Sequence, residues 1–257
     1  MKTVDINSDL GESFGAYTIG NDKEVLQYIS SANIACGFHA GDYNVLMKTV
    51  QTAADLGVSI GAHPGFPDLA GFGRRDMHMS QQEIYNLVVY QIGAIQAAAT
   101  VAGTSVHHVK PHGALYNLAS KDDVVASAIA KAVHAVDPDL ILFGLAGSEL
   151  VRAGEKVGLK VAQEVFADRT YQPDGTLTPR SHANAMIHEA DLAVKRVLRM
   201  VTEGKVTAVN GEDISIQADT ICVHGDEPEA LEFVRKLRAK LEENQVEIQA
   251  FGAVDQL

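Results

Sequence analysis

The sequence has 257 residues, which suits one large α/β domain that buries enough surface to fold without a disulfide framework. Its 21 Lys and Arg residues against 33 Asp and Glu residues give a net charge of −12, which argues against a nucleic-acid-binding role. It shows neither a signal-like apolar segment at its start nor an uninterrupted apolar stretch of about 18 residues, so we expect a cytoplasmic protein without a membrane segment.

Seven short apolar runs are predicted to be β-strands. Their apolar content is nearly continuous, as expected for parallel strands that helices cover. In chain order they are Val4–Asn7, Ala32–Cys36, Val58–Ala62, His108–Lys110, Leu140–Leu145, Lys160–Glu164 and Thr220–Val223. The two cysteines, Cys36 and Cys222, lie in these runs, and we expect them to be reduced core residues.

Helical patterns follow most of the strands. Asp42 is the expected N-cap of a helix that runs to Leu56. Ser80 and Glu83 fit a capping box at the start of another helix, and the last long helix is expected to open at Asp226. Strands that alternate with helices lie parallel, and seven strands predict a distorted barrel that falls short of the usual eight.

Two segments depart from this alternation. Residues 66–79 are predicted to form a long polar loop, which includes Arg74. Residues 206–217 are predicted to form a hairpin with Asn210-Gly211 near its turn. No proline- or serine-rich linker divides the chain. We therefore predict a single α/β domain over residues 1–257, a seven-stranded parallel β/α barrel with the hairpin as an insertion.

Polar residues and glycines follow each predicted strand, and the carboxyl ends of parallel barrel strands gather at one rim. Asp9, His39 and His63 follow the first three strands. Two imidazoles and a carboxylate suit a divalent metal, Mg²⁺ or Zn²⁺, which would acidify a bound water. Asp5 and Asp42 are alternative carboxylates. The same side chains could instead cap and link loops.

Lys110 and His112 follow the fourth strand. A lysine leaving a strand end is a fixed cation for a carboxylate or phosphate oxygen, and a histidine two residues later can transfer protons. The alternative is that Lys110 pairs with a carboxylate of a neighbouring strand and that His112 caps the next segment.

Later strand ends add further candidates. Glu164 is a possible base with Asp168 as its electrostatic partner, although internal ion pairs would use the same residues. Arg169 follows these two carboxylates, and Arg74 and Arg75 in the long loop are candidates for binding an anionic group. His224 would lie beside the first strand if the barrel closes. The expected catalytic residues are thus Asp9, His39, His63, Lys110, His112 and Glu164, and the expected substrate-binding residues are Asn7, Arg74, Asp168, Arg169 and His224.

As a set and in this order, these motifs resemble the lactam-utilisation protein family, which comprises the A subunit of the bacterial ATP-dependent 5-oxoprolinase. The resemblance covers essentially the whole chain. The most specific strings are Asp5–Glu12, Ala32–Asp42, Gly61–Gly65, Gly71–Arg75, Val109–Tyr116, Glu164–Arg169 and Val223–Asp226. Strings of this length are far more specific than a short pattern.

The resemblance implies a distorted seven-stranded barrel of the glycoside hydrolase and deacetylase type. It also implies cleavage of 5-oxo-L-proline to L-glutamate coupled to ATP hydrolysis, in a complex with subunits B and C. Kinship with the deacetylases favours Asp9, His39 and His63 as a metal triad, by analogy of fold. Which of the three subunits binds ATP stays open.

Two other functions stay open on the sequence. The chain could be a stand-alone, metal-dependent amide or sugar deacetylase on the same barrel. It could also be a non-catalytic subunit that binds the lactam or holds its partners together. The density of His, Asp, Glu and Lys at strand ends favours a catalytic role over the second of these.

Overall fold

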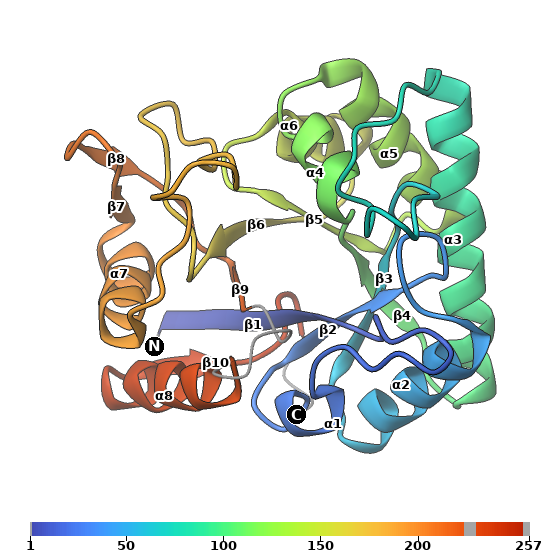
Figure 1. Ribbon diagram of the computed structural model, residues 1–257, viewed down its shortest axis with the longest axis horizontal. Coiled ribbons are helices and arrows are strands. Elements are labelled where there is room, and N and C mark those ends of the chain that lie inside the picture. Colours follow the sequence, from blue (N-terminus) through green and yellow to red (C-terminus); the bar gives the residue numbers. More distant parts are fainter. Residues whose placement is uncertain (1, 224–229, 254–257) are drawn as a thin grey trace.

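Seven parallel strands close into a barrel in the computed structural model, which describes residues 2–223 and 230–253 (Figure 1). The last of these strands pairs with both the sixth and the first, which completes the ring. This confirms the predicted fold. In order around the barrel the strands are β1 (Lys2–Leu10), β2 (Ser31–Ala35), β3 (Ser59–His63), β4 (Val106–Val109), β5 (Ile141–Leu145), β6 (Val161–Phe166) and β9 (Thr220–Cys222).

Helices surround the barrel, and the local signals that start them are the predicted ones (Figure 1). The Asp42 carboxylate accepts hydrogen bonds from two backbone N–H groups of the following turn, and Ser80 and Glu83 form a complete capping box. The helices are α1 (Asp22–Val25), α2 (Tyr43–Asp55), α3 (Gln81–Val101), α4 (Gly113–Ala119), α5 (Asp123–Val136), α6 (Glu149–Val157), α7 (Ala190–Glu203) and α8 (Ala230–Glu243). Asp226 and His224 lie outside the described residues.

The predicted hairpin is present as β7 (Lys205–Thr207) and β8 (Asp213–Ser215), which pair antiparallel. One strand was not predicted. β10 (Val246–Ile248) pairs in parallel with the first residues of β1, before β1 joins β9 and then β2. A run of three residues carries too little pattern to be recognised. Because β1 pairs with three different strands along its length, it extends well beyond the predicted apolar run.

Helix α3 is long and apolar enough to cross a membrane by length and composition alone. Within its 18-residue apolar window, 44% of the helix is buried inside the protein. Its buried side, which includes Ile84, Val88, Ile92 and Ile95, belongs to the main hydrophobic core. Packing in the core therefore accounts for its apolar composition.

The lumen of the barrel is polar near its floor, and its polar groups bond one another. Asp5 accepts hydrogen bonds from the hydroxyls of Ser30, Ser31 and Thr220. Burial raises the pKa of Asp5 to about 6, although these hydrogen bonds oppose the shift. Asp5, considered above as an alternative metal ligand, is thus held by three hydroxyls inside the barrel. Asp42, the other alternative, caps α2.

Gly61 in β3 has no room for a side chain, which gives a test of the lumen packing. A Cβ at Gly61 would overlap the ring of His108, which is itself fully buried. We expect Gly61→Ala to lower the free energy of unfolding by about 1–3 kcal/mol, measured by urea denaturation. Gly93 in α3 is the matched control, because a Cβ there meets nothing within 4 Å. Gly93→Ala should stabilise the protein by about 0.5–1 kcal/mol. Equal stability of the Gly61→Ala and wild-type proteins would contradict the packing.

Candidate active site

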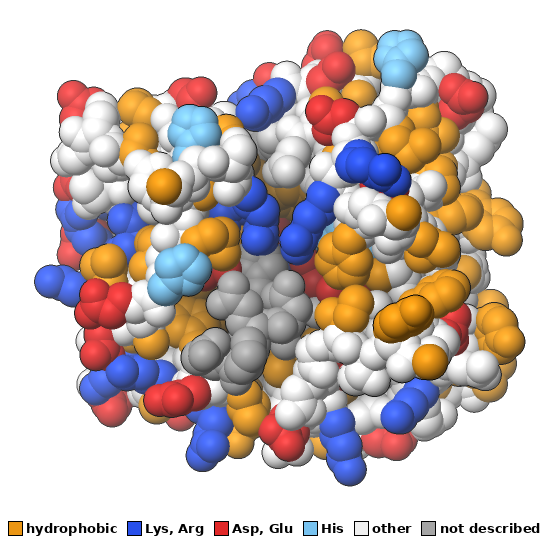
Figure 2. Space-filling view, in the orientation of Figure 1, with side chains coloured by type: hydrophobic (Ala, Val, Ile, Leu, Met, Phe, Trp, Pro, Cys, Tyr) orange, Lys and Arg blue, Asp and Glu red, His pale blue; other side chains and the backbone are white. Residues whose placement is uncertain are grey.

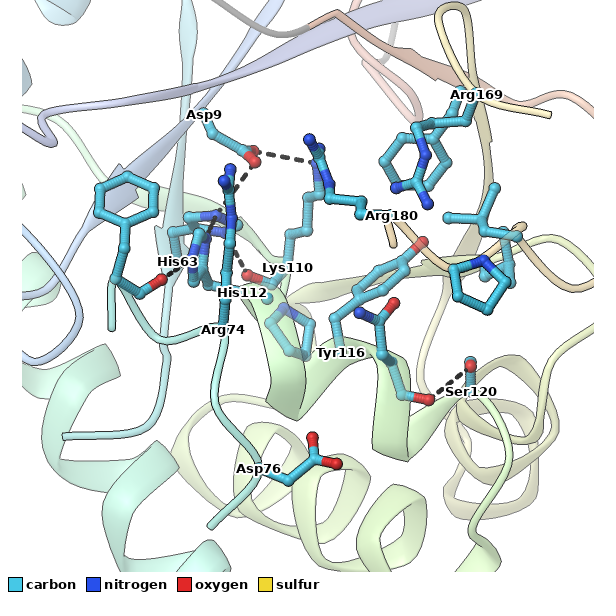
Figure 3. A pocket seen from close by; sticks show the side chains of 18 of the residues that line it. Asp9, His63, Arg74, Asp76, Lys110, His112, Tyr116, Ser120, Arg169 and Arg180 are labelled. Carbon is cyan, nitrogen blue, oxygen red and sulfur yellow. Dashed lines mark hydrogen bonds and ion pairs between the residues drawn. The ribbon is translucent and has the colours of Figure 1, made fainter. Parts of the chain in front are cut away.

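A cavity of about 420 Å³ opens at the carboxyl ends of the strands, as the sequence predicted. Figure 2 shows Lys and Arg side chains on both sides of the hollow at the centre of this face. Six of the predicted site residues line the cavity, from four different strand ends and one long loop: Asp9, His63, Arg74, Lys110, His112 and Arg169 (Figure 3). Positions far apart in the sequence therefore converge on one mouth.

The other predicted residues are placed differently. Asn7 lies in the lumen, where its side chain bonds Thr220 and Asn33. His39 and Glu164 are fully buried and stand behind the lining residues. Asp168 does not line the cavity. The remaining candidate, His224, is outside the described residues, so the structure says nothing of it.

Glu12, His39, His63 and His112 form a buried group that could hold a metal ion, since their ligand atoms lie within 4.8 Å of one another. His63 Nδ1 lies 2.7 Å from the Lys110 carbonyl oxygen, and His112 Nε2 lies 2.8 Å from that of Phe72. A carbonyl oxygen can only accept a hydrogen bond, so these two ring nitrogens carry the protons. Backbone anchoring of this kind is typical of histidines that bind metals.

The inner nitrogens of the same two rings face each other. His112 Nδ1 lies 2.9 Å from His63 Nε2, and in neutral rings both of these atoms carry lone pairs. Two lone pairs at this separation repel unless a proton or a metal cation lies between or beside them. The donor set therefore fits a divalent cation.

His39 completes the arrangement. Its ring stacks on His112 with centroids 3.7 Å apart, and its Nε2 lies 3.3 Å from Glu12 Oε1. Burial lowers the pKa of His39 well below its usual value and that of His112 to about 3, and the neighbouring histidines add to both shifts. Both rings are thus neutral at neutral pH, which is the form that binds metals.

This group differs from the metal triad expected from the sequence. Glu12 and His112 belong to it, whereas Asp9 lies beside it, with Oδ2 at 3.2 Å from His63 Nε2. Sequence reasoning did not single out Glu12 as a site residue. The available signal was its position directly after Gly11, at the end of the first rim motif.

Lys110 is the centre of a buried ion cluster. Its Nζ lies 2.7 Å from Glu164 Oε1 and 3.0 Å from Asp9 Oδ1. Burial by itself would lower the pKa of Lys110, but the two carboxylates and the nearby Cys222 raise it well above the usual value. Lys110 thus pairs with carboxylates across the lumen, from β1 and β6, and not with a carboxylate of a strand next to β4. Its charge orients Asp9 beside His63.

Three further observations complete the site. Tyr116, which the sequence analysis did not select, donates a hydrogen bond of 2.6 Å to Glu164 Oε2 and lines the cavity. His112 occupies the N-cap position of α4, but its side chain makes no capping bond and points to His63 instead. Arg75 pairs with Asp68, whereas the adjacent Arg74 lines the cavity beside the ring of Phe72.

Comparison with known proteins gives near full-length matches. The profile of the LamB/YcsF family matches residues 4–256. The A subunit of 5-oxoprolinase from Oceanobacillus iheyensis is 63% identical over 246 residues, which cover 96% of each chain. The A subunit of 5-oxoprolinase from Bacillus subtilis is 59% identical over 252 residues, which cover 98% of each chain.

Solved structures agree with these matches. The lactam utilization protein from Thermus thermophilus superposes with a TM-score of 0.92 at 48% identity, covering 98% of this chain and all of that one. A deacetylase solved with its substrate superposes with a TM-score of 0.51 at 16% identity, covering 96% of this chain and 87% of that one. The second likeness concerns the fold alone.

Proposed function

Because the chain belongs to the LamB/YcsF family, we propose that it is the subunit of a 5-oxoprolinase in which the lactam ring of 5-oxo-L-proline is opened to L-glutamate. Relatives of 57–63% identity over nearly their whole length are named as the A subunit of 5-oxoprolinase. The observation that carries the proposal is the rim cavity, in which a histidine cluster, Asp9 and Lys110 meet around a space suited to a small ligand.

The proposal includes ATP and two partner subunits, B and C. The relatives are named as one lettered subunit of an enzyme, which supports an assembly of several chains. A five-membered lactam is an unstrained amide and hydrolyses slowly, so activation is needed. Transfer of the ATP γ-phosphoryl group to the carbonyl oxygen makes the carbon electrophilic. One water adds to this carbon, the ring C–N bond breaks as its nitrogen takes a proton, and a second water releases phosphate from the acyl phosphate.

The residues would share this work as follows. Asp9 orients the attacking water and Glu164 transfers protons. While no cation occupies the inner nitrogens of His63 and His112, these two rings would also orient the water, and His112 would share the proton transfer. Glu12, His39, His63 and His112 would hold a divalent cation, which would supply Lewis acidity when bound. Lys110 holds Asp9 in place through their ion pair.

We also propose that the chain acts in the cytoplasm as one domain. Cys36 and Cys222 are free and buried, which suits a reducing compartment. The hairpin contributes Val206 to the main hydrophobic core, and Ile216, which follows β8, belongs to the same core. The hairpin therefore packs as part of the barrel.

Reconstitution tests the proposed function. The chain, ATP and 5-oxo-L-proline are assayed for glutamate and phosphate, first alone and then with the two partner subunits. We expect glutamate only from the mixture. The metal-competent cluster supports a second candidate, a stand-alone deacetylase. Release of acetate by the lone chain with Zn²⁺ or Mn²⁺ and without ATP, together with an inactive mixture, would favour that candidate.

A further inference from the structure

The two sides of the cavity wall carry different groups. Figure 3 shows His63 and His112 on one side and Arg169 on the other, with Tyr116 between them. The histidine side also holds the carboxylates Asp9 and Glu12. Two more cations, Arg180 and Lys121, line the cavity, and Arg180 lies close enough to Arg169 to influence its pKa. A ligand that reaches Arg169 would thus lie near two guanidinium groups.

Arg169 is a cavity-lining cation that is buried and only partly bonded. Its side chain comes from the segment after β6, and the residue is 6% exposed. One guanidinium nitrogen donates to the Thr178 carbonyl oxygen at 2.6 Å. Its Nε is buried and has no hydrogen-bond partner among the described residues. A buried donor without a partner costs stability unless a ligand satisfies it.

Like charge adds to this cost. Burial lowers the pKa of Arg169 to about 10, and the neighbouring guanidinium of Arg180 contributes to the shift, although Asp168 opposes it. An anion bound between the two arginines would relieve both the repulsion and the missing bond. A planar guanidinium matches a carboxylate in particular, because it can donate two parallel hydrogen bonds.

We propose that Arg169, together with Arg180, binds the carboxylate of the lactam substrate and so selects cyclic amides that carry a carboxylate beside the ring nitrogen. The inference rests on the proposed function and assigns a residue to substrate selection. Lys110 and Arg74 are the other candidates for this task, but Asp9 and Glu164 already occupy Lys110, and Arg74 lies on the histidine side of the cavity (Figure 3). With its carboxylate at Arg169, the ligand would extend its amide towards His63 and Asp9, where the chemistry is placed.

Binding to the purified full chain tests the inference without partner subunits. Calorimetry compares 5-oxo-L-proline with 2-pyrrolidinone, the same lactam without a carboxylate, and with inorganic phosphate. We expect the wild-type chain to prefer 5-oxo-L-proline by about 10- to 100-fold over 2-pyrrolidinone. Arg169→Met should remove this preference, because it weakens the binding of 5-oxo-L-proline and leaves that of 2-pyrrolidinone unchanged. Arg180→Met changes an exposed residue and should reduce the preference without a risk to folding.

Arg196→Met is the matched control. Arg196 is also a partly buried arginine, with two nitrogens that find no hydrogen-bond partner in the described part of the chain, but it lies on α7 and does not line the cavity. Its substitution should leave the preference unchanged. The inference would be overturned if Arg169→Met weakened the binding of both lactams equally. It would also be overturned if Arg169→Met and Arg180→Met both kept the wild-type preference for 5-oxo-L-proline. Loss of phosphate binding alone would overturn it as well, since that result would assign the arginines to a phosphate. Selective 5-oxo-L-proline binding without turnover in the mixture would reject the proposed function and retain this subsite.

Discussion

Replacing Lys110 with methionine is expected to lower glutamate release by the reconstituted complex about 100-fold or more. The same substitution should lower the free energy of unfolding by about 3–5 kcal/mol, because it leaves the Asp9 and Glu164 carboxylates without their buried cation. Loss of the cation also frees Asp9 from its position beside His63. Activity is measured as glutamate formed in the presence of ATP, and stability by urea denaturation.

A second variant separates the two effects. In Lys110→Met/Glu164→Gln one carboxylate charge leaves with the lysine, so much of the lost stability should return while activity stays low.

The pKa of Lys110 is raised in the folded chain, so the contribution of this lysine to stability is complete at neutral pH. It is lost only as the pH rises above the ordinary lysine value of about 10.4 and through the raised one. Near wild-type stability and activity of Lys110→Met would contradict the importance of the ion cluster for stability and catalysis.

A divalent metal should bind the isolated chain, and single histidine substitutions should abolish most of the affinity. We expect calorimetric titration with Zn²⁺ to give one site per chain. His63→Ala and His112→Ala should each weaken Zn²⁺ binding on the order of 100-fold, because losing a metal ligand lowers the affinity at least as much as losing a residue that orients a ligand. Each variant removes one of the two facing nitrogens, which lie 2.9 Å apart.

Controls for the metal experiment come from the same chain. His134 is an exposed histidine on α5, and His134→Ala should leave the affinity unchanged. Asp9→Asn tests the grouping of ligands, because Asp9 lies beside the cluster and not within it. Weak, unsaturated Zn²⁺ uptake that is the same in wild type and His63→Ala would contradict a metal site at this cluster.

Local signals in the sequence were sufficient for the barrel. The seven apolar runs, the Asp42 cap, the Ser80–Glu83 capping box and the hairpin turn each depend on neighbouring residues, and all appear in the structure. The rim position of Asp9, His63 and Lys110 followed from the same logic, because parallel strands share the direction of their ends.

Pairings across the lumen could not be read in this way. That Lys110 reaches Asp9 and Glu164 at once depends on the stagger of β1, β4 and β6, which no local pattern encodes. The inclusion of Glu12 in the histidine cluster depends on how the chain turns after β1. β10 was missed because its order comes from pairing with β1 and not from its own three residues.

The central claim is that the rim cavity of this chain opens the lactam ring. The most direct test is glutamate release by the complex reconstituted with the wild-type chain, His63→Ala, His112→Ala or Lys110→Met, with assembly verified by co-elution of the three subunits. We predict that each variant assembles with its partners and releases glutamate more slowly than wild type, by about 100-fold or more. Rates near wild type in all three variants would mean that the chain only binds its partners or the lactam, and that the reaction takes place elsewhere.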